Sequence, residues 1–246
     1  MANILISVCA NGNITYWHTI SGKSIITIKE DPPSDLYALD ISSNGNLLAV
    51  AGKDHTVKIY DDNIKSLVTT LKAADAVNEG HCNRIFSVKF TEDPNVLLSG
   101  GWDNCVYIWD IRVKKSFGLL YGPHICGDTI DKRGDMVLTG SYSNKDVLQL
   151  WSFSKRSLVC NIPWEGSVGA HEYGFLYSAM FEKHGAYIAA GGAGKNEAHF
   201  FKNGKGYEMM GKIMLDNTVT SIDFTKNRRT VALGCGNGLT YSFSFK

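Results

Sequence analysis

The segment GHCNRIFSVKF at residues 80–90, followed by LLSGGWDNCVYIWDIR at residues 97–112, constrains the fold of this 246-residue chain more than any other feature. It holds a Gly-His pair and three stretches rich in β-branched and aromatic residues. Turn residues separate these stretches from one another. Such stretches, with apolar and polar residues in alternation, predict β-strands. Fainter copies of the unit recur along nearly the whole chain. The sequence therefore predicts a series of small sheets.

An aromatic residue near the end of the third strand marks each copy of the unit. The series is Trp17, Tyr60, Trp109, Trp151, Phe201 and Phe243. Its spacing of 42 to 50 residues is close to the period of about 40–45 residues that four-stranded propeller blades show. No segment has a sustained helical period, and no long polar linker interrupts the repeats. We therefore expect one all-β domain over residues 1–246.

These features resemble the WD-repeat (tryptophan-aspartate repeat) β-propeller family along almost the whole chain. The likeness is strongest in residues 80–112 and weaker elsewhere, because the later copies lack the Trp-Asp ending. The resemblance implies a propeller of about six four-stranded blades. It also implies a buried hydrogen-bonded network in the third copy. The residues of that network are His81, Ser99, Asp103 and Trp109.

The copies at the two ends of the chain are short, so we expect both terminal blades to be incomplete. The first begins at its second strand, near Ile4, and the last stops before its outermost strand, which gives 22 expected strands. Three explanations stay open. The chain is a fragment of a longer propeller, the ring is six-bladed with a weak seam, or a partner donates a strand to an incomplete blade.

The charge balance and the absence of familiar ligand motifs exclude several functions. With 25 basic and 24 acidic residues, the chain has no field that attracts nucleic acid or a membrane surface. No stretch reaches the roughly 18 apolar residues of a membrane span, and the start of the chain does not resemble a signal peptide. The six cysteines form no C-x-x-C pair. We expect a cytoplasmic chain with reduced thiols, no metal and no cofactor.

Two glycine-rich motifs look like phosphate or dinucleotide loops but lack the helix that such loops need. They are GGAGKN at residues 191–196 and GCGNG at residues 234–238. Because each lies between two expected strands, no helix N-terminus follows to supply a positive dipole. We interpret both as turns inside a sheet.

The candidate partner-binding residues come mainly from the family pattern. The resemblance implies that the residue before the turn Asp points to the top face of the propeller, which selects Lys53 and Trp102 and, by a looser alignment, Tyr142. Arg84, at the start of an inner strand, is expected near them. Exposed aromatic and Arg side chains together are typical of binding hot spots. Burial of Trp102 against a neighbouring loop is the alternative.

The segment HICGDTID at residues 124–131 departs from the pattern of an inner strand. Gly127 indicates a close approach of another backbone. His124 and Asp128 either contact a ligand or peptide at the channel mouth or belong to an atypically packed blade. Together with Asp131 they form the one cluster that an enzyme of this fold would use.

Arg112 follows the Trp-Asp pair of the third copy and resembles the WD-x-R box of propellers that dock on cullin-RING ubiquitin ligase adaptors. The alternative is a solvated arginine after a strand. We predict that the chain is a non-enzymatic scaffold, which binds a protein or peptide through its top face. A ubiquitin-ligase substrate receptor and a permanent structural subunit of a large assembly are the alternatives, and an enzyme is the least favoured.

Overall fold

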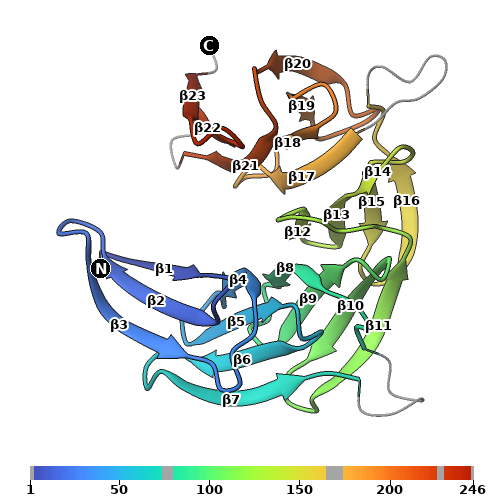
Figure 1. Cartoon of the computed structure of the whole chain (residues 1–246). Coiled ribbons are helices and arrows are strands. Elements are labelled where there is room, and N and C mark those ends of the chain that lie inside the picture. The colour runs from blue at the N-terminus through green and yellow to red at the C-terminus, as the bar shows by residue number, and fades with distance from the viewer. Residues whose placement is uncertain (1–2, 74–79, 165–173, 226–229, 245–246) are drawn as a thin grey trace. The chain divides into compact units, whose positions relative to one another are not determined.

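The computed structural model describes residues 3–73, 80–164, 174–225 and 230–244, and every regular element in these ranges is a β-strand (Figure 1). The strands form six sheets, which we number along the chain. The chain divides into two compact units. Unit 1 is Met1–Asp103 with Tyr107–Gly118, and unit 2 is Asn104–Val106 with Leu119–Lys246.

Unit 1 contains the first three sheets. The first sheet is β1 (Ile4–Val8), β2 (Asn13–His18) and β3 (Lys23–Lys29). The second is β4 (Leu36–Ile41), β5 (Leu47–Gly52), β6 (Val57–Asp61) and β7 (Ser66–Leu71). The third is β8 (Ile85–Phe90), β9 (Val96–Gly101), β10 (Cys105–Asp110) and β11 (Lys115–Tyr121), of which residues 105–106 and 119–121 are counted in unit 2.

Unit 2 contains the other three sheets. The fourth is β12 (Ile130–Arg133), β13 (Met136–Gly140), β15 (Leu148–Ser152) and β16 (Ser157–Asn161). The fifth is β14 (Tyr142–Ser143), β17 (Gly174–Phe181), β18 (Tyr187–Ala193), β19 (Glu197–Lys202) and β20 (Met209–Met214). The sixth is β21 (Val219–Phe224), β22 (Thr230–Cys235) and β23 (Thr240–Ser244).

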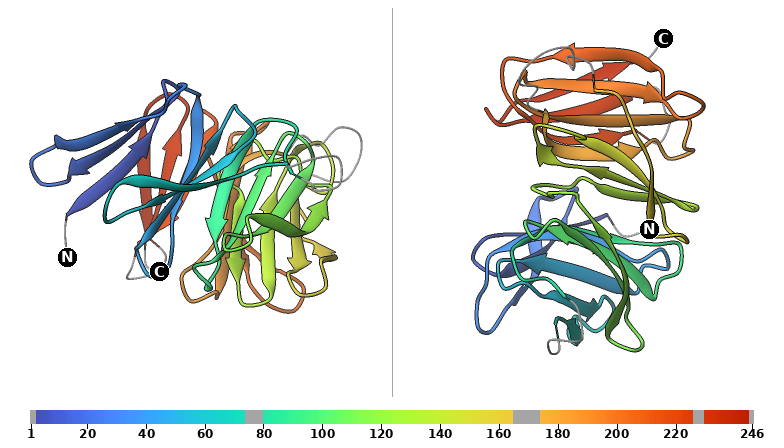
Figure 2. Two further views of the ribbon diagram at one scale, coloured as in Figure 1. Left: turned by 90° about the horizontal axis from the view of Figure 1, so that it is seen from below. Right: turned by 90° about the vertical axis from the view of Figure 1, so that its right-hand side faces the viewer.

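Each sheet follows the chain in a simple meander, and its strands twist as they stack side by side (Figure 2). The exception is β14, which leaves the fourth sheet and pairs antiparallel with β17 of the fifth. All described strands other than β14 match the 22 expected ones. The first and sixth sheets have three strands each, so the expectation of incomplete terminal blades is confirmed for the described residues.

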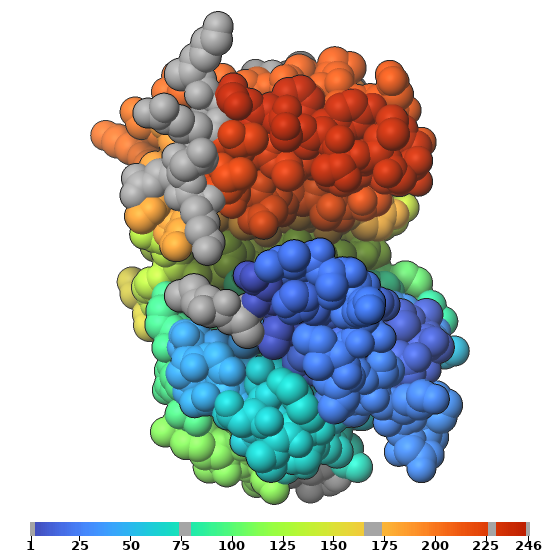
Figure 3. Space-filling view, turned by 90° about the vertical axis from the view of Figure 1, so that its left-hand side faces the viewer, coloured from blue at the N-terminus to red at the C-terminus, as the bar shows by residue number. Residues whose placement is uncertain are grey.

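Within each unit, the cores lie between successive sheets. The middle strands β5, β9 and β15 are buried on both faces, as their nearly continuous apolar sequences require. In unit 2, Leu138 of the fourth sheet packs in one cluster with Leu176 and Ile188 of the fifth. The outermost strands β3 and β16 are mostly exposed. Figure 3 shows part of the surface that β1–β3 form on unit 1, and part of the surface of β21–β23 on unit 2.

In four sheets the first strand has a β-bulge near its start. Each bulge contains one extra residue, and the bulge sets the direction of its side chain. The register shifts between Leu36 and Ala38, and equivalent shifts occur in β8, β17 and β21. A bulge turns the extra residue out of the regular alternation of the strand. The extra residues are Tyr37, Phe86, Tyr177 and Thr220.

Glycine allows the backbone to approach closely beside these bulges. A Cβ atom added at Gly101 would lie 2.0 Å from the carbonyl oxygen of Arg84. At Gly127 it would lie 2.2 Å from the carbonyl oxygen of Tyr177, so the close approach expected from the sequence is confirmed. Both glycine-rich motifs span strand-to-strand turns, as expected: one connects β18 to β19 and the other β22 to β23. The described residues contain no helix with the length and apolar character of a membrane span.

Candidate partner-binding surface

Three aromatic rings of unit 1 lie in a row on the surface, which we call the aromatic row. The ring centroids of Tyr37 and Phe86 are 4.9 Å apart with nearly parallel planes, and those of Phe86 and Trp102 are 5.1 Å apart. Tyr37 and Phe86 are the bulge residues of β4 and β8, whereas Trp102 follows β9. Trp102 is 37% exposed. The three rings therefore form a partly exposed aromatic surface in which each ring contacts the next.

Two basic side chains border the aromatic row. The guanidinium carbon of Arg84 lies 5.2 Å from the ring centroid of Trp102, which is within the range of a cation–π contact. Lys53 is exposed, and its Nζ lies 3.7 Å from Oδ2 of Asp35. The hydroxyl of Tyr37 donates to the same carboxylate oxygen at 2.9 Å. The structure thus places Trp102, Arg84 and Lys53, three of the candidate residues in unit 1, along the aromatic row, whereas Arg112 is not part of this group.

Backbone hydrogen bonds hold this arrangement in place. The amide of Trp102 donates to the carbonyl of Arg84 at 3.0 Å, and that of Lys53 donates to the carbonyl of Asp35 at 2.9 Å. Burial raises the pKa of the Tyr37 hydroxyl, and its hydrogen bond to Asp35 raises it further, so this group stays protonated at neutral pH. The surface therefore presents rings held in place, the guanidinium of Arg84, and the hydroxyl of Tyr37, whose proton is already donated to Asp35.

The four residues of the expected network in the third sheet are joined by short hydrogen bonds. Nδ1 of His81 lies 2.7 Å from Oδ2 of Asp103, and Nε2 lies 2.7 Å from Oγ of Ser99. The indole N–H of Trp109 donates to the same Oγ at 2.7 Å. His81, Ser99 and Trp109 are buried. Because all of these groups are used in internal bonding, the His–Asp pair is part of the packing of the sheet.

Arg112 is exposed but is held by a neighbour. Its Nε and Nη2 donate to the two carboxylate oxygens of Asp110 at 3.0 and 2.6 Å. This hydrogen bonding lowers the pKa of the Asp110 carboxyl. The fork-shaped pair fixes the guanidinium on the surface at the turn between β10 and β11.

Unit 2 has a second group of stacked rings, which does not involve the aromatic row. The rings of Tyr142 and Phe175 stack with centroids 4.3 Å apart, and the centroid of Tyr177 lies 5.5 Å from that of Tyr142. Burial, with a hydrogen bond to Tyr142, raises the pKa of Tyr177 to about 12. The rings meet because β14 pairs with β17, so Tyr142 lies opposite Phe175.

The expected cluster of His124, Asp128 and Asp131 is engaged in separate interactions. Nδ1 of His124 lies 2.7 Å from Oδ1 of Asn104. The backbone of Asp128 forms a parallel bridge to β17, and the carboxylate of Asp131 accepts from the amide of Phe181 at 2.8 Å. These interactions tie the irregular start of the fourth sheet to the third and fifth sheets, which is what atypical packing of this segment requires.

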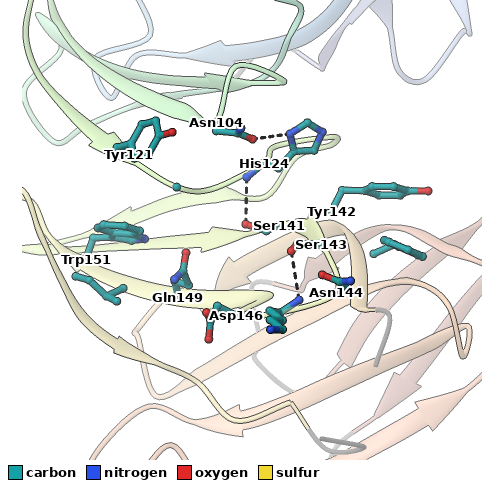
Figure 4. Close-up of a pocket in the computed structure, with 14 residues that line it drawn as sticks. Asn104, Tyr121, His124, Ser141, Tyr142, Ser143, Asn144, Asp146, Gln149 and Trp151 are labelled. Atoms are coloured by element: carbon teal, nitrogen blue, oxygen red, sulfur yellow. Dashed lines mark hydrogen bonds between the residues drawn. The ribbon is translucent and has the colours of Figure 1, made fainter. Parts of the chain in front are cut away.

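An open cavity of about 880 Å³ lies beside the fourth sheet of unit 2 (Figure 4). Its size is within the range of ligand sites in proteins. His124 and Tyr142 line it, whereas Asp128 does not. The floor includes Trp151 and Gln149 of β15. In the part of the chain that the structure describes, no three His, Cys, Asp or Glu side chains are grouped as a metal site requires.

Comparison with known proteins relates this geometry to a family. The WD40 family (WD domain, G-beta repeat) matches residues 22–61 and 67–110, which run from β3 to β6 and from β7 to β10. The matched part includes Ser99, Asp103 and Trp109 of the hydrogen-bonded network. The chain contains WD repeats in these two segments. Its fold class is the all-β propeller, and its six sheets are blades.

Curated relatives of this WD-repeat protein have diverse names. It is 34% identical to WD repeat-containing protein 89 homolog of Dictyostelium discoideum over 41% of this chain and 23% of that protein. It is 30% identical to the Target of rapamycin complex subunit LST8 of Saccharomyces cerevisiae over 46% of this chain and 35% of that one. It is 22% identical to Cell division cycle 20.1, cofactor of APC complex, of Arabidopsis thaliana over 93% of this chain and 48% of that protein. The chain thus spans less than half the length of each of these relatives.

Sequence reasoning about this WD-repeat protein missed the bulge residues Tyr37, Phe86 and Tyr177. Their signal was present, because each is the second residue of one of the alternating stretches LYALDI, IFSVKF and LYSAMF. Regular alternation assigns these rings to one side of a strand. The bulge changes that direction, and a bulge has no clear mark in a single sequence.

Proposed function

We propose that this WD-repeat protein is a non-enzymatic scaffold that binds a protein or peptide through the face that carries the aromatic row. The observation that carries the proposal is the aromatic row, in which Tyr37 stacks on Phe86, Trp102 lies tilted beside Phe86, and Arg84 lies over the Trp102 ring. Stacked rings beside a guanidinium supply large contact area that loses little side-chain entropy on binding. Relatives named as complex subunits, LST8 and wat1, support a scaffold role.

The role of each side chain in binding depends on how firmly the protein holds it before a partner arrives. Trp102 is held by Arg84 and Phe86, so a partner need not order it. Lys53 is exposed at the border, where a charged group adjusts specificity more than affinity. We therefore assign the anchoring role to Trp102 and Arg84 and the rim role to Lys53.

Affinity purification from native cells tests this function. The wild-type chain, Trp102→Ala and Arg84→Ala serve as baits, and Ile64→Ala, at a 73% exposed position in unit 1, serves as a matched control. We expect one set of proteins to be lost with both test variants and kept with the control, while all four baits show the same thermal unfolding. Retention of every protein by both test variants places the binding surface elsewhere.

A second candidate function is a substrate receptor of a cullin-RING ubiquitin ligase. The bidentate pair of Arg112 with Asp110 favours it, because the pair presents a fixed guanidinium on the surface. The test is co-purification of a ligase adaptor with the wild-type chain and its loss with Arg112→Ala. An Arg112→Lys variant keeps the charge and lacks the fork, so it separates charge from geometry.

Three broader expectations accompany the proposal. We propose that residues 1–246 act as one domain in the cytoplasm, that no nucleic acid or membrane is bound, and that an incomplete terminal blade accepts a strand from a partner. A single calorimetric transition tests the first of these, and two separated transitions contradict it. A permanent place in a large assembly is the alternative, which predicts that the isolated chain is insoluble.

A further inference from the structure

Each of three blades has one residue, just before its first strand, that fills a recess beside its third strand. In the third blade this residue is His81. Its ring packs edge-on against Tyr107 with centroids 4.7 Å apart, and it bonds to Asp103 and Ser99. We call a residue in this place a plug. Tyr107 lies two positions before Trp109, the marker aromatic of the blade.

In the second blade the plug is Glu30, which comes before β4. Its Oε2 lies 2.8 Å from Nζ of Lys58, and its Oε1 accepts from the hydroxyl of Tyr60 at 3.4 Å. Lys58 and Tyr60 hold the same two positions that Tyr107 and Trp109 hold in the third blade. The plug is buried, and its charge is opposite to that of Lys58.

In the fifth blade the plug is Trp164, which comes before β17. Its ring stacks on His199 with centroids 3.9 Å apart and planes 5° apart. It also lies 6.2 Å from Phe201, the marker aromatic of that blade. The three plugs therefore differ in type, and each matches the residue two positions before the marker aromatic.

The fourth blade has the cavity at this place. The two corresponding residues are Gln149 and Trp151, and both line the cavity. The segment before β12 leaves β15 uncovered at this place, and Nδ1 of its His124 lies 2.7 Å from Oδ1 of Asn104 (Figure 4). A Cβ atom added at Gly122 would have one near neighbour, an atom of the Trp151 ring at 3.8 Å. The chain thus provides the floor of a plug site without its plug.

The floor fixes which atoms face the cavity. Nε2 of Gln149 donates to Oδ1 of Asn161 at 2.9 Å, and Nδ2 of Asn161 donates to Oδ1 of Asp146 at 2.7 Å. The amide oxygen of Gln149 is then left to accept a bond, and Figure 4 shows it toward the cavity. Gln149 presents a flat amide where the third and fifth blades present the rings of Tyr107 and His199.

The lining of the cavity mixes aromatic and aliphatic side chains with uncharged polar ones, and its charges are balanced. Tyr121 and Leu158, both exposed, form one side beside Trp151. Lys145 and Asp146 are a lining amine and a lining carboxylate, so neither sign of charge dominates. A mixed lining with no excess of either charge favours an uncharged planar side chain that carries one polar group over an ionic side chain.

We propose that this cavity binds an aromatic side chain with one hydrogen-bond donor, a tryptophan or tyrosine, presented by a partner protein. The ring stacks on the Gln149 amide and the Trp151 ring, and its N–H or O–H donates to the Gln149 oxygen. The occupant takes the place that His81 and Trp164 take in their own blades. The cavity lies in unit 2 and shares no residue with the aromatic row.

Nuclear magnetic resonance with the isotope-labelled 246-residue chain tests the site. The probes are capped five-residue peptides of Gly and Ser with a central Trp, Leu or Arg. We expect the Trp peptide to shift the indole resonance of Trp151 and the side-chain amide of Gln149. We also expect it to bind about threefold to tenfold more tightly than the other two, the range that one hydrogen bond with stacking supplies.

Two substitutions on one strand provide a matched pair. Leu158→Trp puts a ring on a residue that lines the cavity, whereas Val159→Trp puts one on a neighbour that does not. We expect the first to abolish binding of the Trp peptide and the second to leave it unchanged. Both positions are exposed strand positions, so both variants should fold, and circular dichroism checks that they do.

Several results overturn the site. Equal binding of the three peptides, shifts that fall outside the cavity residues, or undiminished binding by a folded Leu158→Trp each contradict it. Gln149→Leu adds a test of the hydrogen bond, because it should remove the preference for Trp over a peptide with central Phe. Gln149→Leu also removes the hydrogen bond to Asn161. The affinity of the folded variant for the Phe peptide is therefore the reference against which its affinity for the Trp peptide is compared.

Discussion

The imidazole of His81 and the hydroxyl of Ser99 lie 2.7 Å apart in the buried interior of the third blade. That hydroxyl also accepts the indole N–H of Trp109, so one small side chain joins two large ones. The joint lies at the centre of the copy that matches the family pattern best. The stability of unit 1 is therefore expected to depend on it.

The substitution Ser99→Ala should destabilise the protein by about 2–3 kcal/mol, because it leaves two buried polar groups without their shared partner. The free energy of unfolding in urea measures this. Ser43→Ala removes a hydroxyl from an exposed site and should change stability by less than about 0.5 kcal/mol. Equal losses for the two variants contradict the role of Ser99.

The substitution Lys58→Met should destabilise the second blade by about 2 kcal/mol. The buried carboxylate of Glu30 would then lose the amine 2.8 Å away. Adding Glu30→Gln to Lys58→Met should restore part of the loss, since it removes the uncompensated charge. Additive losses in this double-mutant cycle, measured by urea unfolding, count against the ion pair.

A second ion pair of Lys58, with the carboxylate of Asp54 at 2.7 Å, predicts a pH dependence. Burial alone would raise the pKa of Asp54, but hydrogen bonds from Lys58 and Thr56 outweigh it and hold this pKa below its usual value. Asp54 therefore stabilises the fold above about pH 4, and this contribution is lost as pH falls through its lowered pKa. The difference in stability between wild type and Lys58→Met should shrink between pH 5 and pH 3. A constant difference in thermal unfolding midpoints argues against this coupling.

The substitution Gly127→Ala should destabilise unit 2 by about 2 kcal/mol or more, because the new methyl group would meet the carbonyl oxygen of Tyr177 at 2.2 Å. Gly204→Ala is the control, since nothing lies within 4 Å of a Cβ atom there. The control should be neutral or slightly stabilising. A thermal shift assay distinguishes the two outcomes, and tolerance of Gly127→Ala rules out the close contact.

Loss of Trp102 should leave the fold nearly intact. The ring is 37% exposed and rests on Phe86, so Trp102→Ala should cost about 1 kcal/mol or less, whereas Ile85→Ala, at a fully buried neighbour, should cost about 2–5 kcal/mol. Urea unfolding of the two variants measures the contrast. A cost for Trp102→Ala as large as that for Ile85→Ala would assign the ring to the core.

The sequence by itself determined the six sheets and the position of nearly every strand, because period-two alternation and turn residues act within a few residues of one another. The resemblance to the WD-repeat family implied the four residues of the third-blade network. The sequence did not predict strand β14, because a strand of two residues carries no periodic signal.

Tertiary structure alone decided which side chains gather on a surface. Tyr37, Phe86 and Trp102 come from separate strands, and a bulge turns two of them into line. The empty plug site depends on where the segment before β12 turns, which the bond between His124 and Asn104 fixes. Such contacts join residues from 16 to 49 positions apart, and their geometry depends on packing that local sequence patterns do not encode.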